Sequence, residues 1–89
     1  MFYTYVVFSP TYDKIYIGHT NSLQHRVIQH NESSSHGWTR RYKPWQLIYH
    51  ETFKTKSDAI KRERELKSHQ GRKYIREILI PQYKSKLRG

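Results

Sequence analysis

Alternating and clustered apolar side chains predict a small β-sheet in this chain. Residues 2–8 read Phe-Tyr-Thr-Tyr-Val-Val-Phe, which is rich in the aromatic and β-branched side chains that favour strands. A turn-forming sequence, residues 9–13, separates this run from a second strand over residues 14–17 that we expect to stop at Gly18. The pair predicts an antiparallel hairpin, and residues 46–53 predict a third strand.

Helical periodicity accounts for much of the remaining chain. Apolar positions three and four residues apart predict helices over residues 22–31, 57–68 and 72–80. Gly71 is expected to separate the second helix from the third, and Pro81 is expected to end the third. The predicted order of elements is therefore β-β-α-β-α-α.

The ends of these helices and the polar segments between them follow from local chemistry. Ser22, or Asn21 before it, is a suitable N-cap for the first helix, and Thr55 opens the second with the spacing of a capping box. Residues 32–45 are expected to be a polar, basic loop, and residues 81–89 a basic tail that frays. The pattern predicts an α+β fold, a small three-stranded antiparallel sheet flanked by helices, in one domain over residues 1–80.

Composition narrows the possible functions. The chain has 89 residues and no cysteine, which fits one domain without disulfides or thiolate metal sites. No apolar run approaches the roughly 20 residues of a membrane span. We expect a cytoplasmic protein that is a monomer rather than a dimer.

Positive charge is the most informative property of the composition. Seventeen Lys and Arg against seven Asp and Glu give a net charge of +10, most of it in the second half of the chain. Such an excess favours a polyanionic partner, and nucleic acid is favoured over an acidic membrane surface because the basic segment also carries Glu63, Glu65 and Glu77. A purely solubilising surface is the plainer alternative.

Glu63 does not fit the amphipathic pattern of its helix. At about 100° per residue it falls on the side of the apolar residues Ala59, Ile60 and Leu66. A carboxylate in this position requires a partner, and both an ion pair and a metal ion satisfy the requirement. Glu65 is expected to point into solvent.

Arg26, His30 and the strand tyrosines are further candidates for chemistry. Arg26 lies one helical turn before His30, at the edge of the predicted apolar face, where a guanidinium can hold a phosphate. Strand alternation places Tyr5 on one face of the first strand, and Tyr16 on the opposite side from its neighbours Ile15 and Ile17. Each of these residues also has a plain structural interpretation as a packing or surface residue.

Other common sites are absent from the sequence. None of the six histidines has a metal-ligand spacing, and there is no phosphate-binding loop, dinucleotide fingerprint or serine-hydrolase elbow.

The motif Tyr16-Ile17-Gly18, with Arg26 and His30 following it, resembles the GIY-YIG nuclease superfamily. The resemblance covers roughly residues 2–80 and is closest to the short, stand-alone bacterial members. It includes the run from Ser57 to Lys67, which is similar to the helix that bears the family's metal-binding glutamate. The first family motif departs from the pattern, because Tyr3-Thr4-Tyr5 keeps only its tyrosine.

The resemblance implies a metal-dependent endonuclease that acts on DNA rather than on RNA, and it implies a role in DNA repair. It implies a catalytic set of Tyr5, Tyr16, Arg26, His30 and Glu63, with Glu63 holding one Mg²⁺ or Mn²⁺ ion that binds weakly without substrate. Tyr16 would orient or activate the attacking water, although a tyrosine with a pKa near about 10 is a poor base at neutral pH.

Basic side chains outside this set are expected to grip the nucleic-acid backbone. They are Arg40, Arg41, Lys43, Lys61, Arg64, Lys67, Arg72 and Lys73. Trp38, Tyr42 and Trp45 are candidates for stacking on bases, with Trp45 favoured as a core residue.

Two alternatives stay open at this stage. One is a catalytically inactive nucleic-acid-binding module with the same fold. The other is a ribosome-associated or RNA-binding module that uses its aromatic residues for stacking. The presence of Tyr16, Arg26 and Glu63 together argues against the first alternative, and the second has no need for a carboxylate within an apolar helix face.

Overall fold

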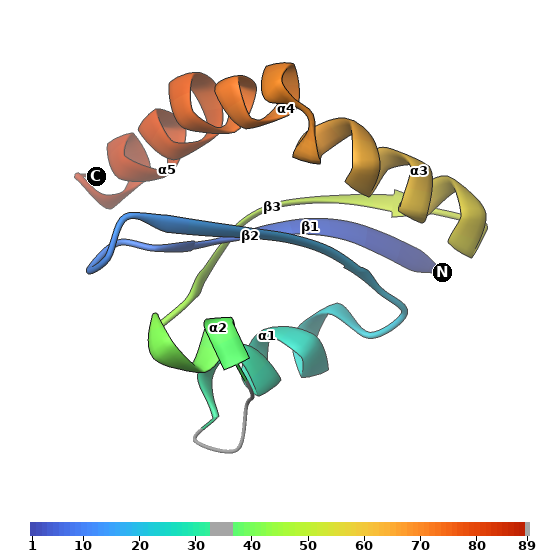
Figure 1. Ribbon diagram of the computed structural model, residues 1–89, viewed down its shortest axis with the longest axis horizontal. Coiled ribbons are helices and arrows are strands. Elements are labelled where there is room, and N and C mark those ends of the chain that lie inside the picture. The colour runs from blue at the N-terminus through green and yellow to red at the C-terminus, as the bar shows by residue number, and fades with distance from the viewer. Residues whose placement is uncertain (33–36, 89) are drawn as a thin grey trace.

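A three-stranded antiparallel sheet divides the molecule into two helical layers (Figure 1). The computed structural model describes residues 1–32 and 37–88. The strands are β1 (Phe2–Ser9), β2 (Lys14–Thr20) and β3 (Gln46–Phe53), arranged in the order β2-β1-β3. Both β2 and β3 are therefore edge strands, and the predicted α+β class is confirmed.

Helices cover both faces of the sheet. Helices α1 (Leu23–Asn31) and α2 (Gly37–Arg41) lie on one face in Figure 1. The opposite face is covered by α3, α4, the π-helical segment η1 and α5, which span Lys56–Lys67, His69–Tyr74, Ile75–Leu79 and Ile80–Leu87. Within the described residues, no helix combines the length and apolar character needed to cross a membrane.

The alternation of β1 builds two cores from one strand. Val6 and Phe8 face the layer of α3 to α5, where they pack with Ile15, Ile17, Leu66, Ile75, Leu79 and Ile80. Tyr5 and Val7 face the α1 layer and pack with Trp45. Because side chains alternate along a strand, the even-numbered residues of β1 and the odd-numbered residues of β2 face the layer of α3 to α5. The residues between them face the α1 layer.

The strand and helix boundaries differ from the expectation at several places. β2 does not stop at Gly18 but continues to Thr20, paired with β1 along its whole length. The expected loop at 32–45 contains α2, while residues 33–36 of that loop lie outside the described residues. Ser22 occupies the N-cap position of α1 without a side-chain capping bond, and its backbone N–H donates to the Thr20 hydroxyl.

The C-terminal helical region departs further from the expectation. Pro81 does not end the helix, and the residues expected to fray are helical as far as Leu87. The π-helical segment η1 ends immediately before α5, where the Ile80 N–H bonds to the carbonyl of Ile75. Pro81 then falls in the first turn of α5, where a missing N–H costs little.

The break between α3 and α4 lies at Ser68 rather than at Gly71. The Ser68 hydroxyl accepts a hydrogen bond from the Gly71 N–H and so caps α4, which begins at His69. Gly71 lies inside α4, against the end of α3. A Cβ at Gly71 would lie 2.3 Å from the Glu65 carbonyl oxygen and 2.5 Å from the Leu66 Cα.

Replacing Gly71 with Ala is expected to lower the free energy of unfolding by about 1–3 kcal/mol, because backbone atoms rather than a flexible side chain block the new methyl group. Urea-induced unfolding followed by circular dichroism measures the change. The matched control is Gln70→Ala at the neighbouring exposed position, which should be nearly neutral. A Gly71→Ala protein as stable as the wild type would contradict the close packing of α3 against α4.

Candidate active site

Tyr5, Tyr16 and His30 form one cluster between β1, β2 and α1. The Tyr5 hydroxyl and His30 Nε2 are hydrogen-bonded at 2.9 Å, although the residues are far apart in the sequence. The His30 ring centroid lies 4.8 Å from that of Tyr16 and 5.8 Å from that of Tyr5. The structure therefore brings together three of the predicted catalytic residues on the α1 face of the sheet.

Gly18 makes room for this cluster. It pairs with Tyr5 across the β1–β2 ladder, and a Cβ at Gly18 would lie 2.8 Å from the Tyr5 hydroxyl oxygen. The same Cβ would lie 3.0 Å from a ring carbon of Tyr16. Glycine is required here by the close approach of two tyrosine rings and not by its backbone conformation.

Burial fixes the protonation of Tyr5 and His30. Burial raises the pKa of Tyr5 well above its usual value, and nearby Tyr16 and Glu63 raise it further against the opposing charge of Arg26. Burial, together with the positive charge of Arg26, lowers the pKa of His30 to about 4. At neutral pH the hydrogen bond therefore joins a protonated phenol to a neutral imidazole.

Arg26 lies at the rim of the cluster. It is exposed on α1, one turn before buried His30, and its charge acts on both Tyr5 and His30. An exposed guanidinium beside partly buried aromatic groups can receive an anion without first giving up a buried partner.

Glu63 lies on α3, on the opposite layer from α1. Its side chain is only 15% exposed, and its two oxygens are bonded to different donors: Oε1 to His19 Nδ1 at 2.6 Å and Oε2 to Lys67 Nζ at 2.7 Å. Burial by itself would raise the pKa of Glu63, but the hydrogen bonds and positive charges of Lys67 and His19 outweigh burial and lower it. Glu63 is therefore a half-buried, ionised carboxylate.

The edge position of β2 connects the two halves of the candidate site. Tyr16 and Gly18 belong to the α1 face of β2, whereas His19 reaches Glu63 on the α3 face. The negative charge of Glu63 is nevertheless close enough to raise the pKa of Tyr5. With no further strand beyond β2, groups on the two faces can meet a common ligand around the edge of the sheet.

His19 is a site residue that the sequence prediction missed. Ending the second strand at Gly18 left His19 in a turn, where its side-chain direction is undefined. Since β2 continues to Thr20, His19 falls on the same face as Ile15 and Ile17, toward α3. If the predicted strand had been extended by two residues, side-chain alternation would have placed His19 on the face that carries Glu63.

The predicted backbone-gripping residues are divided between the two layers. Arg40 and Arg41 are exposed on α2, with half-buried Lys43 after it, while the exposed Lys61, Arg64, Lys67, Arg72 and Lys73 lie on α3 and α4. Lys67 forms an ion pair with Glu63, and this ion pair accounts for the position of its side chain. The structure does not gather this set on one surface.

Metal-binding groups are sparse in the described part of the chain. It holds no cluster of three or more His, Asp or Glu side chains arranged to bind a metal ion. The negative charge of Glu63 acts on Tyr5 and raises its pKa. A single ion held by one carboxylate and completed by water and substrate oxygens is compatible with this arrangement.

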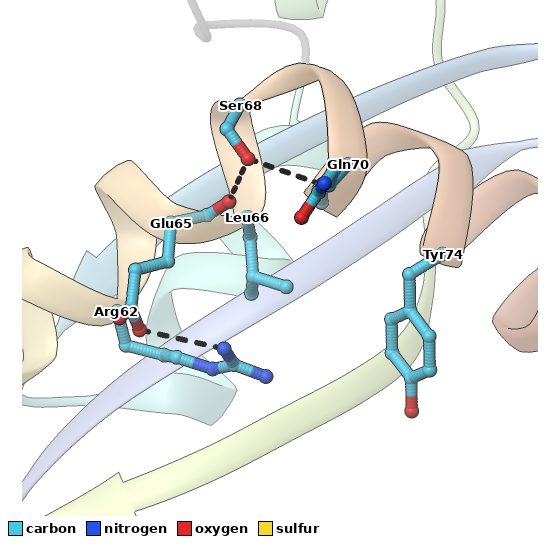
Figure 2. A pocket seen from close by; sticks show the side chains of 7 residues that line it. Arg62, Glu65, Leu66, Ser68, Gln70 and Tyr74 are labelled. Atoms are coloured by element: carbon cyan, nitrogen blue, oxygen red, sulfur yellow. Dashed lines mark hydrogen bonds and ion pairs between the residues drawn. The ribbon is translucent and has the colours of Figure 1, made fainter.

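A separate hollow of about 480 Å³ lies where α3 meets α4 (Figure 2). Its lining residues are Arg62, Glu65, Leu66, Ser68, Gln70, Gly71 and Tyr74, which include none of the candidate catalytic residues. Arg62 donates to Glu51 at 2.8 Å and to Glu65 at 3.4 Å, so its charge is already paired. This hollow therefore belongs to the junction of α3 with α4 and is separate from the tyrosine cluster.

A β2-β1-β3 antiparallel sheet with helices on both faces is consistent with a domain of the GIY-YIG type. The sequence model of the GIY-YIG catalytic domain matches residues 1–75, and the chain belongs to this nuclease domain family. The resemblance predicted from the sequence is thereby confirmed.

The relatives of the chain are short bacterial proteins of the UPF0213 group. One from Staphylococcus saprophyticus is 38% identical over 64 residues, which cover 72% of this chain and 78% of the relative. One from Bacillus pumilus is 39% identical over 69 residues, covering 74% and 70% of the two chains. One from Staphylococcus epidermidis is 40% identical over 55 residues, covering 62% and 67%. No solved structure matches the chain significantly.

The His30 imidazole is expected to titrate with a midpoint near pH 4, measurable by NMR on its ring protons. An unfolded histidine has a pKa near about 6.5, so the unfolded chain takes up this proton first as the pH falls. The contribution of His30 therefore lowers the free energy of unfolding from about pH 6.5 downward and levels off below about pH 4.

A His30→Gln variant removes this part of the pH dependence of stability and keeps a side chain that can bond to Tyr5. His25→Gln, at an exposed position on the same helix, is the matched control and should leave the dependence unchanged. A His30 midpoint of about 6 or above would contradict the buried, neutral imidazole.

Proposed function

We propose that this protein is a divalent-metal-dependent endonuclease that hydrolyses phosphodiester bonds in nucleic acid, with DNA favoured over RNA. The observation that carries the proposal is the pairing, around the edge of β2, of an ionised, half-buried Glu63 with the cluster of Tyr5, Tyr16, His30 and Arg26. Membership in a nuclease domain family supports it.

Glu63 fits the requirements of a single Mg²⁺ or Mn²⁺ ion. Its pKa is lowered, so it is charged at neutral pH, and both of its oxygens already lie against proton donors that stabilise negative charge. Lys67 is about half exposed and flexible, so it can leave Oε2 when a cation arrives. A bound ion would supply Lewis-acid stabilisation of the phosphoryl oxygens and a more acidic water.

The remaining residues of the proposed site have separate roles in binding the phosphate and positioning the water. Arg26 offers guanidinium donors to the scissile phosphate, where charge increases in the transition state. Tyr16, half-buried at the rim of the cluster, positions the attacking water. Tyr5 remains protonated and serves as a donor that fixes the cluster rather than as a base.

His30 is suited to orienting Tyr5 rather than to accepting a proton. Its imidazole is neutral throughout the physiological range because its pKa is about 4. That low basicity makes it a weak general base, and its close contacts with Tyr5 and Tyr16 favour a positioning role.

A catalytically inactive binding module is the alternative function. The net charge of +10 satisfies that alternative as well as it satisfies a nuclease. In a binding module Glu63 would serve only as a structural ion-pair partner of His19 and Lys67, because negative charge at the site repels phosphate. The half-buried position of Glu63 beside the edge strand favours hydrolysis.

We expect Glu63→Gln and Arg26→Ala each to reduce metal-dependent cleavage at least about 100-fold, because each removes a group that stabilises the transition state. Cleavage of labelled single-stranded, duplex, flapped and branched substrates with Mg²⁺ or Mn²⁺ measures the loss. Binding to the same substrates without metal should survive in both variants.

Matched variants separate catalysis from general effects of charge. Glu65→Gln alters an exposed carboxylate on α3, and Gln24→Ala alters an exposed residue on α1; both should cleave as the wild type does. Nucleic-acid binding by the wild type with no metal-dependent cleavage of any substrate would favour the inactive module.

A further inference from the structure

An exposed aromatic surface extends from the candidate active site along the α1 face of the sheet. Tyr12, in the turn between β1 and β2, is 49% exposed, and Trp38, on α2, is 46% exposed. Both pack edge-on against Tyr42, with ring centroids 5.4 Å and 5.2 Å away. We call Tyr12, Trp38 and Tyr42 the aromatic platform.

The platform carries positive charge. Lys14 Nζ lies 5.4 Å and Arg41 Cζ 5.9 Å from the centroid of the Tyr42 ring. Arg40 precedes Arg41 on α2, and Lys43 follows Tyr42. Cations over and around exposed rings suit a ligand that has both flat apolar faces and negative charge.

The platform packs on the buried core of the α1 layer. Trp38 lies 5.6 Å from buried Trp45, whose indole N–H donates to the Thr39 carbonyl at 2.7 Å. The Asn31 side chain donates to the Trp45 carbonyl at 3.0 Å and ties α1 to the same point. Trp45 is therefore a core residue, as the sequence favoured, and the exposed rings are held in place before any ligand arrives.

The platform is continuous with the tyrosine cluster. Tyr42 packs, with Tyr16, against the core of Tyr5, Val7 and Trp45. Trp45 in turn lies 6.4 Å from His30, measured between ring centroids. A strand of nucleic acid with its phosphate at Arg26 can thus continue over the same face to the exposed rings.

We propose that the aromatic platform stacks on unpaired bases next to the scissile phosphate, so that the substrate is nucleic acid with a single-stranded segment. This inference rests on the proposed nuclease function. Bases in an intact duplex are stacked on one another and present only their edges, whereas the faces of unpaired bases are free to stack on Trp38 and Tyr12. The surrounding Lys and Arg side chains then contact the backbone.

Binding measured without divalent metal in a Glu63→Gln background tests the platform apart from cleavage. Fluorescence anisotropy with a labelled oligothymidylate and with a duplex of equal length gives both affinities. The double substitution Trp38→Leu, Tyr12→Leu keeps apolar packing but removes the ring faces. We expect it to weaken single-strand binding about 5- to 150-fold and duplex binding little.

Tyr74→Leu is the matched control, because Tyr74 is an exposed aromatic residue on α4, in the opposite layer. It should leave single-strand binding unchanged. Equal single-strand affinity in the double variant and its parent overturns the proposal, as does an equal loss on Tyr74→Leu. Thermal unfolding confirms that both variants are folded.

Photocrosslinking of the unsubstituted protein to an oligonucleotide containing 5-iodouracil provides a test that does not depend on variants. Crosslinks at Trp38, Tyr12 or Tyr42 support the platform, and crosslinks confined to α3, α4 or α5 overturn it. Platform-dependent binding without cleavage of any substrate would instead reject the proposed nuclease function, so the two failures are distinguishable.

Discussion

The close approach of Tyr5 to Gly18 is the constraint on which the candidate site depends. A methyl group at Gly18 would lie 2.8 Å from the Tyr5 hydroxyl and 3.0 Å from the Tyr16 ring. Because glycine leaves that space open, Tyr5 lies over β2 and reaches His30, and Tyr16 packs beside both. Burial of this cluster then keeps Tyr5 protonated and His30 neutral, so its polar atoms bond to one another. A rigid, uncharged surface results, with Arg26 as the cation at its rim.

The edge position of β2 makes this cluster one half of the proposed site. An interior strand would be flanked on both sides, and its two faces would be separated by the neighbouring backbone. At the edge, the α1 face contributes the tyrosines and Arg26, while the α3 face contributes Glu63, held by His19 from the same strand and by Lys67. In the free protein Arg26 and Glu63 lie on different faces of the sheet, and the charge of Glu63 is balanced by His19 and Lys67. A phosphate and a cation are the pair of ligands that such a divided arrangement suits.

Much of this architecture could be predicted from sequence because its signals are local. Aromatic and β-branched runs marked the strands, and the misplaced charge of Glu63 marked a residue that needed a partner; the structure supplies His19 and Lys67. The predictions that were wrong concerned positions whose structure depends on tertiary contacts. Gly18 looked like a strand end but is a site of close packing, and that error hid His19. Gly71 and Pro81 looked like helix breakers, but Ser68 capping and the π-helical segment accommodate them. The aromatic platform brings Tyr12, from a turn, against Tyr42, which also packs on Trp38 of α2. Periodicity along the sequence does not predict such a long-range contact.

The central claim is that one phosphate bridges the two faces of β2, and a structure of the protein with nucleic acid tests it most directly. A crystal of the complex with a single-stranded oligonucleotide and Ca²⁺, which occupies oxygen sites similar to those of Mg²⁺, would locate both ligands. We expect a backbone phosphate within hydrogen-bonding distance of Arg26 and in contact with an ion bound to Glu63, with Lys67 displaced from the carboxylate. A phosphate held by Arg26 while Glu63 keeps both His19 and Lys67 and binds no ion would contradict the claim.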